Sequence, residues 1–500
     1  MAGAKPKQIH PRRVIIDPIT RIEGHMKVEV ELQGDKVINA WSSGTLFRGM
    51  EIILRGRDPR DATQITQRIC GVCPIDHAVA SATALEDAFG IRPPTNGRIM
   101  RNLTLGAHWL YDHILHFYHL AALDFVKGPD VPPFIPCYDG KGVYKLDPKT
   151  NEKAVKSYLR ALEVKTIAQE MVAMVGGRAP HCHGIVVGGQ TQLLTPDAVP
   201  GFLWRLEEVK AFIDNEYLPT VYAIAKVYPE CFKTGVGCKN VLSYGVFPLN
   251  DERTEFLFKP GVYTNGQDKP LDPEKIVEDV KYSWYADNTS GLKPMTGKTE
   301  AQLGKPSAYT YIKAPRYAGL PHEVGPLARM WVTNPVLSKH ANRFLGVSED
   351  RPVRFRDLGD KAFSTLGRHI ARAEETWCVA NILAEWVKQL DFKAPHYLKV
   401  DVPERGEGMG LSEAARGALG HFIVIQNHKI ANYQCVVPTT WNASPRDDKG
   451  QLGPIEQAIL GTPVPDPENP VEVVRIVRSF DPCLACAVHL LRTNKNIVIR

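Results

Sequence analysis

The segment Arg68–His77 reads RICGVCPIDH, and near the other end of the chain Asp481–His489 reads DPCLACAVH. Each holds one Cys-x-x-Cys pair, namely Cys70 with Cys73 and Cys483 with Cys486. More than 400 residues separate the pairs, so neither is half of a compact zinc knuckle. For the four thiolates to share one site, folding must bring the two extremes of one large domain together.

Four sulfur ligands on one site call for a thiophilic metal. One interpretation is a closed, tetrahedral structural zinc site. Titratable residues nevertheless crowd both pairs: Arg68, Asp76 and His77 flank the first, and Asp481 and His489 flank the second. A nearby positive charge favours the thiolate form, and a nearby carboxylate can receive protons. These surroundings favour a buried metal centre that performs redox chemistry.

Composition places the chain among soluble globular proteins, with 44% hydrophobic and 23% charged residues. The formal net charge of +6 is small for 500 residues and no basic run is concentrated, so no nucleic acid partner is expected. No stretch of about 18 uninterrupted apolar residues is present, so no membrane-spanning helix is predicted. The basic N-terminal segment lacks the apolar region of a secretory signal.

Ten cysteines in a chain of 500 residues do not make a disulfide scaffold. Length alone suggests two to four domains. The long reach between the cysteine pairs argues instead that residues 1–489 form a single interdependent unit.

Hydrophobic periodicity predicts a small antiparallel sheet followed by helices. Within residues 13–43, apolar and charged side chains alternate from Met26 to Leu32, and Gly34-Asp35 supplies a hairpin turn. Helices are expected over residues 96–127, 152–175, 203–228, 324–344 and 365–390. Loops are expected over the Gly- and Pro-rich segments 128–150, 260–310 and 444–470. The predicted fold class is mainly α with a small N-terminal antiparallel β portion.

Further motifs follow one another along the chain. They are RIEGH (Arg21–His25), FRGME (Phe47–Glu51), RDPRDA (Arg57–Ala62), DHILHFYHL (Asp112–Leu120), GGRAPH (Gly176–His181), EAARGALGH (Glu413–His421), NYQCVVPTTWN (Asn432–Asn442) and GPIEQAILGTP (Gly453–Pro463). Together with the two cysteine segments, the chain resembles the large subunit of nickel-iron hydrogenases almost end to end. The resemblance implies the fold of that subunit and reversible heterolytic oxidation of dihydrogen to protons and electrons.

The resemblance also implies a nickel–iron centre held by the four cysteines. Cys70 and Cys483 match the terminal nickel thiolates, and Cys73 and Cys486 match the thiolates that bridge nickel to iron. The family's iron carries carbon monoxide and cyanide, and Thr439 matches the hydroxyl that hydrogen-bonds a cyanide. All four ligand positions are cysteine, which excludes selenocysteine there.

Arg416 matches the arginine that hangs over the open metal face, and Asp112 and Asp481 match its carboxylate companions. A guanidinium held by two carboxylates is a preorganised electrostatic element. The family usually has proline before this arginine. Here the position is Ala415, a departure from the family pattern that concerns the shape of the group formed by Arg416, Asp112 and Asp481.

Glu23 matches the glutamate that takes a proton from the terminal thiolate, here assigned to Cys483. A buried carboxylate with a raised pKa can accept such a proton and pass it on. The alternative for Glu23 is a structural partner of Arg21 or of a backbone amide. The RIEGH motif favours proton transfer.

A second metal site, usually magnesium in this family, is implied by Glu51, the backbone carbonyl of Cys435, and His489. Oxygen ligands suit that ion, whereas a histidine ligand is less typical of it. His77 is expected to contact a cysteine ligand from outside.

The histidines of the 96–127 helix have a plainer interpretation. His116 and His119 are expected to satisfy core hydrogen bonds. The spacing of His108, Asp112 and His116 also allows an independent two-metal site, which we consider the weaker reading.

Residues 490–500 follow His489 and carry none of the expected ligands. Related chains are commonly made with such a tail, which a maturation endopeptidase removes after nickel insertion. The resemblance therefore implies a precursor form. The alternative is a C-terminal strand that stays in place.

Splitting dihydrogen releases two electrons, and no remaining cysteine cluster in this chain holds an iron–sulfur relay. An iron–sulfur small subunit is therefore expected as an obligate partner with a large interface. The resemblance to uptake enzymes adds a membrane cytochrome b or another acceptor. It also implies a membrane-associated, outward-facing location reached through the partner's twin-arginine signal, with a cytoplasmic enzyme as the alternative.

Two rival functions remain at this stage. One is a non-enzymatic subunit of a larger electron-transfer complex, whose related subunit has lost the nickel ligands; the presence of all four cysteines here argues strongly against it. The other is a four-cysteine zinc protein without hydrogenase activity.

Overall fold

The computed structural model describes residues 11–138, 140 and 142–487. His489 and the predicted tail 490–500 lie outside these residues. In the described part, helices dominate and several small antiparallel sheets accompany them, so the predicted class is confirmed.

The predicted N-terminal sheet is present as β1 (Arg12–Ile16), β2 (Met26–Gln33) and β3 (Lys36–Gly44), paired antiparallel in that order. The alternation along β2 has the expected result, since Met26, Val28 and Leu32 are buried. The RIEGH segment lies in the connection between β1 and β2.

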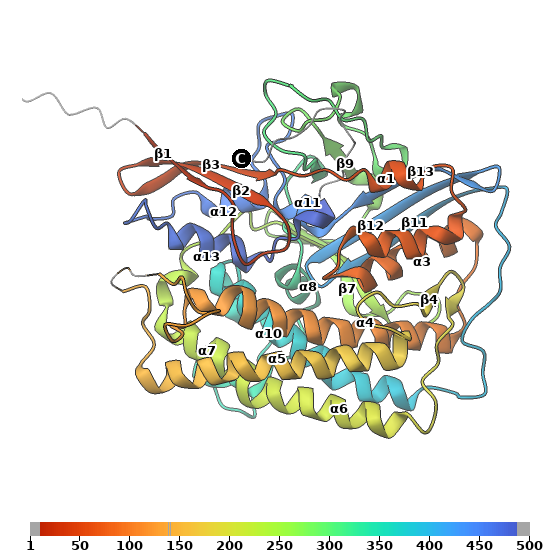
Figure 1. The fold of residues 1–500 in the computed structure, drawn as a ribbon, viewed down its shortest axis with the longest axis horizontal. Coiled ribbons are helices and arrows are strands. Elements are labelled where there is room, and N and C mark those ends of the chain that lie inside the picture. The colour runs from red at the N-terminus through yellow and green to blue at the C-terminus, as the bar shows by residue number, and fades with distance from the viewer. Residues whose placement is uncertain (1–10, 139, 141, 488–500) are drawn as a thin grey trace, which may run out of the picture.

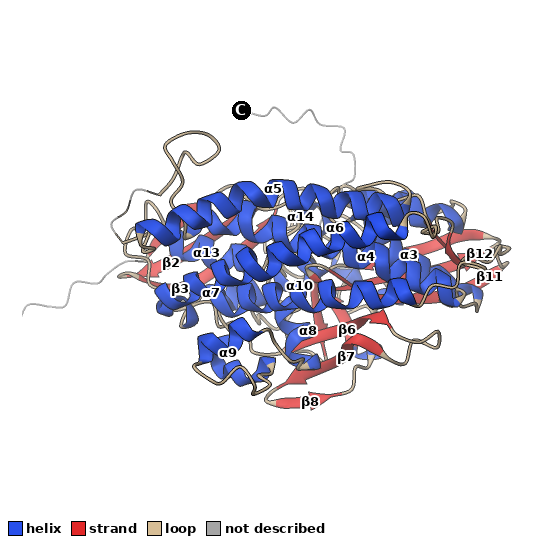
Figure 2. Cartoon of the chain, turned by 90° about the horizontal axis from the view of Figure 1, so that it is seen from below, coloured by secondary structure: helices blue, strands red, loops and turns tan. Residues whose placement is uncertain are grey.

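The long helices form a layer on one side of the molecule (Figures 1 and 2). They are α4 (Thr95–Leu115), α5 (Pro148–Gly176), α6 (Val199–Phe212), α7 (Leu218–Val227) and α10 (Thr365–Lys388). Helix α4 packs against α5 and α10, and α10 also contacts α6. A π-helical turn, His116–Ala121, and a 3-10 turn, Ala122–Asp124, extend α4 to nearly the predicted end.

Two predicted helices are each divided in the structure. A π-helical turn, Ile213–Tyr217, separates α6 from α7. The predicted helix 324–344 is two helices, α8 (Pro326–Thr333) and α9 (Lys339–Leu345). Asn334 caps α8 in the left-handed region at φ 51°, and the proline that follows cannot continue a helix.

Several strands were not predicted. They are β4 (Ile185–Val186), β5 (Gly189–Gln190), β6 (Val241–Pro248), β7 (Phe256–Thr264), β8 (Gln267–Lys269), β9 (Ile276–Asp279), β10 (Ala314–Tyr317), β11 (Arg405–Ala414), β12 (Gly417–Gln426) and β13 (Lys429–Val436). The loop prediction for residues 260–310 was therefore wrong where β7, β8 and β9 lie. Strand β6 is buried along almost its whole length, so it lacks the apolar–polar alternation that marks a half-buried strand.

The remaining helices are short except for α3. They are α1 (Met50–Leu54), α2 (Ala62–Thr66), α3 (Pro74–Phe89), α11 (Pro438–Asn442), α12 (Pro454–Ile459), α13 (Val471–Ser479) and α14 (Leu484–Ala487). None of the helices among the described residues combines the length and apolarity needed to cross a membrane.

Helix α3 lies directly on the hairpin of β11 and β12 (Figure 1). Glycines allow this contact: a Cβ at Gly408 would lie 2.0 Å from the carbonyl oxygen of Ala84. One at Gly410 would lie 2.1 Å from that of Ala80. The glycine spacing in β11 thus lets the helix backbone rest on the strand.

The four cysteines belong to one buried apolar cluster that also contains the N-terminal sheet and α13. Residues from both ends of the described chain therefore share a core. A second, larger buried cluster fills the helical layer.

Candidate metal centre

The N-terminal cysteine pair is held by local structure. Cys70 follows the 3-10 turn Gln67–Ile69, and Cys73 is the residue at the N-terminal cap of α3. The backbone amide of Val72 donates to the Cys70 sulfur over 3.3 Å. Both thiols are therefore positioned by a tight loop at the start of a long helix.

The C-terminal pair is held by residues distant in sequence. The amide of Cys483 donates to Thr439 Oγ1 over 2.9 Å. The amide of Leu484 donates to the Glu23 carbonyl over 2.9 Å, and the Glu23 amide donates to the Pro482 carbonyl over 3.3 Å. The second pair is thus docked against the N-terminal connection and α11.

The four sulfurs converge on one point. Cys70 Sγ lies 3.4 Å from Cys483 Sγ, Cys73 Sγ lies 3.1 Å from Cys486 Sγ, and Cys483 and Cys486 are 2.9 Å apart. Four sulfurs placed tetrahedrally about 2.3 Å from one metal stand about 3.8 Å apart, so the cluster is nearly of metal-binding size. The four side chains are at most 2% exposed.

Burial raises the pKa of the Cys483 and Cys486 thiols well above the ordinary value. Four buried thiolates in contact repel one another, so a bound cation is needed for them to ionise together. The donor set therefore fits a thiophilic metal centre, and a zinc ion and a nickel–iron pair both meet this condition.

Glu23 reaches the C-terminal pair directly. Its Oε2 accepts from the Cys483 thiol over 3.1 Å and from the Ala485 amide over 2.9 Å. Burial is the main reason that its pKa is raised. Arg21 instead pairs with Asp124, so the predicted alternative of a Glu23–Arg21 pair is not present.

Arg416 occupies the two-residue turn between β11 and β12. Its Nη1 donates to Asp112 Oδ2 over 2.9 Å, and its Nε lies 3.1 Å from Asp481 Oδ1. The guanidinium therefore bridges α4 and the C-terminal cysteine segment. Its Nη2 has no partner among the described residues, and burial raises the pKa of Asp112.

An ion-pair network that the sequence analysis missed supports this turn. Arg329 pairs with Glu375 at 2.6 Å and with Glu413 at 2.7 Å, all fully buried. Arg329 also donates to the backbone carbonyls of Ala414 and Ala415, each over 2.8 Å. The carbonyl before Arg416 is thus fixed although alanine replaces the family's proline. Glu413 lies inside the EAARGALGH motif, which was the available signal.

His77 joins the centre to a buried hydrogen-bond chain. Its Nε2 lies 3.4 Å from Cys486 Sγ, and its Nδ1 lies 3.0 Å from His421 Nε2. His421 Nδ1 lies 2.7 Å from the Tyr433 hydroxyl, which donates to Ser81 over 3.0 Å. The predicted contact of His77 with a cysteine is present.

Glu51 lies in a separate polar site. Its Oε1 accepts from the Cys435 amide over 2.8 Å, and its other oxygen accepts from Thr299. Lys313 lies beside it and contacts Glu278 and Gln434, each over 3.1 Å. Oxygen donors fit a hard cation here, and the third predicted ligand, His489, lies outside the described residues.

The alternative two-metal site on α4 is not assembled as predicted. His108 Nε2 lies 3.4 Å from Asp76 and 3.8 Å from Asp112, whereas His116 Nε2 contacts the Arg478 carbonyl over 2.7 Å. His119 contacts the Tyr158 carbonyl over 3.3 Å. The core hydrogen bonds expected for His116 and His119 are therefore present.

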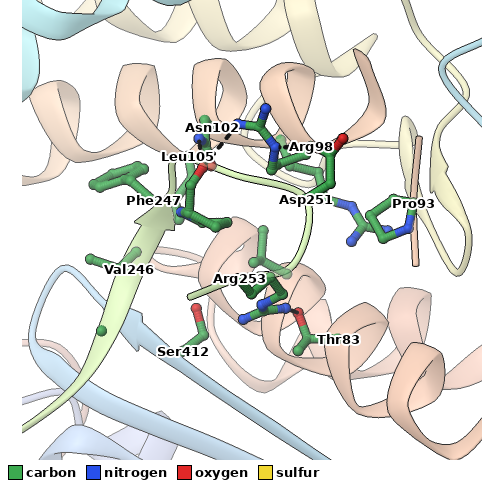
Figure 3. A pocket seen from close by; sticks show the side chains of 14 residues that line it. Thr83, Pro93, Arg98, Asn102, Leu105, Val246, Phe247, Asp251, Arg253 and Ser412 are labelled. Atoms are coloured by element: carbon green, nitrogen blue, oxygen red, sulfur yellow. Dashed lines mark hydrogen bonds and ion pairs between the residues drawn. The ribbon is translucent and has the colours of Figure 1, made fainter. Parts of the chain in front are cut away.

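A small cavity elsewhere is lined by several arginines (Figure 3). Arg98 pairs with Asp251, and Arg101 with Glu86. About 30 Å³ remains inside, room for a water or two. The third arginine of the lining, Arg253, donates to the neutral groups Thr83 Oγ1 and the Leu411 carbonyl. None of the predicted site residues lines this cavity.

The fold and this site define a class: a large, mainly helical subunit whose two ends close a buried four-thiolate metal centre, with a carboxylate and a fixed guanidinium beside it. The model of the family described as "Nickel-dependent hydrogenase" matches residues 48–132 and 126–489, and one described as "HoxL-like" matches residues 13–40.

Individual proteins agree with this match. The chain is 52% identical to the periplasmic [NiFeSe] hydrogenase large subunit of Desulfomicrobium baculatum, over 96% of this chain and 95% of that protein. It is 37% identical to the hydrogenase-2 large chain of Escherichia coli K12, over 98% and 99% of the two chains.

Solved structures agree as well. A structure of the D. baculatum [NiFeSe] hydrogenase superposes with a TM-score of 0.93 at 52% identity, covering 96% of this chain and all of that one. One from D. vulgaris Hildenborough gives 0.94 at 49% identity, with the same coverage. The chain therefore belongs to the nickel-dependent hydrogenase family, as a large subunit. The predicted family is confirmed, and the two rival functions are not favoured.

Proposed function

We propose that this chain oxidises dihydrogen reversibly and heterolytically at a nickel–iron centre held by Cys70, Cys73, Cys483 and Cys486. The convergence of four buried sulfurs from the two ends of the chain is the observation that carries this proposal. When bound, the metal centre supplies the place where dihydrogen is split and its electrons are collected. Carbon monoxide and cyanide on the iron are part of the proposal.

The sulfurs take different roles in it. When the metals are bound, Cys70 and Cys483 would hold the nickel, and Cys73 and Cys486 would hold both the nickel and the iron. Thr439 accepts from the Cys483 amide, which leaves its own hydroxyl hydrogen to donate to a cyanide.

Glu23 receives the proton that leaves the centre. It lies 3.1 Å from Cys483 Sγ, within direct transfer distance. Its raised pKa, caused first by burial, brings the carboxylate closer in basicity to a thiolate. The contact with Ala485 fixes one oxygen of Glu23 in place.

Arg416 provides a fixed positive charge beside the centre. Asp112 and Asp481 hold its guanidinium, so little reorganisation is needed as charge develops nearby. All three side chains are buried, which excludes bulk water from this side.

A second metal, magnesium or a similar ion, is proposed at Glu51, the Cys435 carbonyl and His489. The buried carboxylate of Glu51 beside Thr299 and Gln434 supports it. This ion would tie the C-terminal segment to the core. Removal of residues 490–500 by a maturation endopeptidase, and the single unit over 1–489, belong to the same proposal.

The electrons leave through a small subunit with iron–sulfur clusters, in an obligate heterodimer. The relative from D. baculatum is named periplasmic, and a relative from Wolinella succinogenes, 34% identical over 97% of both chains, is named quinone-reactive. These names support an outward-facing, membrane-associated uptake enzyme that passes electrons to a membrane cytochrome b or a similar acceptor.

The test is metal analysis of the chain purified with its native partner, together with infrared spectra in the cyanide and carbonyl stretching region. Nickel and iron with these bands, and dihydrogen-dependent reduction of a viologen dye, are expected. Zinc alone without the bands would contradict the proposal.

A further inference from the structure

Two buried side chains outside the cysteine centre face Asp112, the carboxylate that holds Arg416. His108 lies one turn before Asp112 on α4, and Asp76 lies in the first turn of α3. Helix α3 packs against α4. The side chains of Asp76, His108 and Asp112 are at most 1% exposed, and one atom from each lies within 4.8 Å of the other two. The two helices therefore bring two carboxylates and an imidazole together in the protein interior.

Asp76 is held in place by a tryptophan. Trp109 Nε1 donates to Asp76 Oδ1 over 3.0 Å. The Arg329 guanidinium lies over the Trp109 ring, 4.4 Å from its centroid, and Arg329 also fixes the backbone carbonyl before Arg416. Because the indole occupies Oδ1, the second oxygen of Asp76 is left to face His108.

His108 lies between the two carboxylates. Its Nε2 is 3.4 Å from Asp76 Oδ2 and 3.8 Å from Asp112 Oδ2. Neither contact has the geometry of a hydrogen bond, so the interaction is an ion pair. Burial lowers the pKa of His108, but the charges of Asp76 and Asp112 outweigh this effect, and the pKa lies above its ordinary value. The surroundings therefore favour a positively charged imidazolium.

The row of charges continues toward the cysteine centre. Asp112 Oδ2 accepts from Arg416 Nη1 over 2.9 Å, and Arg416 Nε lies 3.1 Å from Asp481 Oδ1. From Asp76 through His108, negative and positive groups thus alternate as far as Asp481. Without a positive charge at His108, the carboxylates of Asp76 and Asp112 would face each other in the interior, where like charges repel strongly.

Asp112 needs such a fixed neighbour. Its Oδ1 is buried and has no hydrogen-bond partner among the described residues, so Arg416 bonds only one of its two oxygens. Attraction between His108 and Oδ2 keeps this oxygen in place. A carboxylate that keeps its charge and its orientation can hold a guanidinium in one position.

Two carboxylates and an imidazole at this spacing could also bind a divalent cation. The contact with Arg416 argues against that interpretation. Asp112 Oδ2 already accepts from the guanidinium, whose positive charge would repel a second cation. A protonated His108 supplies the positive charge that the two carboxylates require.

We propose that His108 is a positioning residue: paired with Asp76, it holds Asp112 in place as a charged carboxylate, and Asp112 in turn fixes the Arg416 guanidinium beside the metal centre. His108 acts only through Asp112 and Arg416 and contacts neither the metals nor dihydrogen. The effect on turnover rests on the proposed function, whereas the placement of Arg416 does not.

The first test is the position of Arg416 in high-resolution crystal structures of the purified heterodimer. His108→Gln keeps a hydrogen-bond donor but removes the charge, and Arg416 is expected to move away from Asp112 and lose the 2.9 Å hydrogen bond. His119→Gln is the matched control, since His119 contacts only the Tyr158 carbonyl at its Nε2 and should leave Arg416 unmoved.

Two results of these structures would overturn the proposal whether or not the enzyme oxidises dihydrogen. One is an unmoved Arg416 in His108→Gln. The other is a metal ion bound by Asp76, His108 and Asp112 in the unmodified enzyme.

The second test is a double-mutant cycle on dihydrogen-dependent dye reduction. His108→Gln alone is expected to lower kcat about tenfold, with KM for dihydrogen, nickel content and the infrared bands unchanged. In an Arg416→Lys background, the same change should lower kcat by less than about twofold, because the residue through which His108 acts is already altered. An equal loss in both backgrounds would mean a merely structural role, and no loss in either would remove His108 from positioning. Both results would overturn the proposal.

Asp76→Asn tests the pair from its other end. Asparagine keeps the size of the side chain and an oxygen for Trp109, but it removes the negative charge that favours a protonated His108. We expect kcat to fall about tenfold. The double variant with His108→Gln should lose less than about twofold more, since the two residues act as one unit. Fully additive losses would overturn the pairing. Asp76→Asn also serves as the test variant where His108→Gln fails to assemble.

Failure of the proposed function has a different signature. The unmodified heterodimer would then show no dihydrogen-dependent dye reduction and no cyanide or carbonyl bands. The position of Arg416 in the crystal structures would still decide whether His108 fixes it.

Discussion

The two cysteine pairs of this centre are built in opposite ways. Cys70 and Cys73 stand at the start of a 16-residue helix and depend on their immediate neighbours. Cys483 and Cys486 stand in a loop and the four-residue helix α14, and depend on Glu23 and Thr439. We call Cys70 and Cys73 the preformed half of the site, because neighbours in sequence position them. We call Cys483 and Cys486 the docked half, because contacts with distant residues position them.

The substitution with the largest expected effect is Cys486→Ser, and Cys73→Ser is its counterpart in the other cysteine pair. Either change removes one of the four converging sulfurs, and we expect nickel and iron to be lost and activity to fall below detection. Without metal, amide hydrogen exchange should rise much more in Leu484–Ala487 than in α3, because only the docked half relies on distant contacts. Equal increases in both segments would contradict the comparison.

Glu23→Gln tests the docked half without removing a ligand. The amide keeps an oxygen that can accept from Ala485 but is a poor base. We expect turnover to fall by about 10²-fold to 10⁴-fold at unchanged nickel content. The measurement is dihydrogen-dependent dye reduction beside metal analysis, with Glu29→Gln on β2 as the matched control. Normal turnover would remove Glu23 from the proton path.

Arg416→Lys tests the group that joins α4 to the C-terminal cysteine segment. Lysine keeps the charge but has no planar fork to hold both Asp112 and Asp481. Activity is expected to fall about 100-fold with metal retained. Arg98→Lys, at the separate arginine-lined cavity, is the control and should leave turnover near normal. Unchanged rates in the Arg416 variant would mean that the guanidinium does not assist the chemistry.

Gly24→Ala is the mildest test. A Cβ there would lie 2.8 Å from Leu484 Cβ and 3.0 Å from the Ala485 amide, in a residue at φ +80°. The strain of about 1–3 kcal/mol should loosen the docked pair and lower nickel occupancy several-fold. Gly34→Ala has a similar φ of +66° but nothing within 4 Å, so it isolates the backbone effect. Equal nickel contents in the two variants would show that the contact with Leu484 is unimportant.

The sequence predicted some parts of the molecule well, for identifiable reasons. The β2 strand and helices α4, α5 and α10 have strong periodicity, and the quoted motifs led to the four cysteines, Glu23 and Arg416. Strand β6 was not predicted because it is buried on both faces and therefore lacks apolar–polar alternation. The β11–β12 hairpin was not predicted because its turn, Ala415-Arg416, lacks the Asn-Gly or Asp-Gly sequence typical of hairpin turns.

The sequence patterns did not predict the contacts that support the site. Arg329 and Glu375 lie on different helices, and nothing in either segment indicates that they meet beneath the Arg416 turn. The stacked rings of His116 and His369 are a similar case. The sequence predicts His116 as a core histidine, but its neighbour His369 comes from a helix more than 200 residues later. Such pairs are fixed by packing of distant elements, which periodicity does not encode.

The contact between Cys70 and Cys483 spans 413 residues of sequence. During synthesis at about 5–20 residues per second, the first pair would emerge roughly 20–80 s before the second. Through that interval the two thiols of the first pair stand without their partners from the second pair. Time, as much as geometry, is therefore a constraint on this centre: the early thiols must stay reduced and unoccupied until the last segment of the chain arrives.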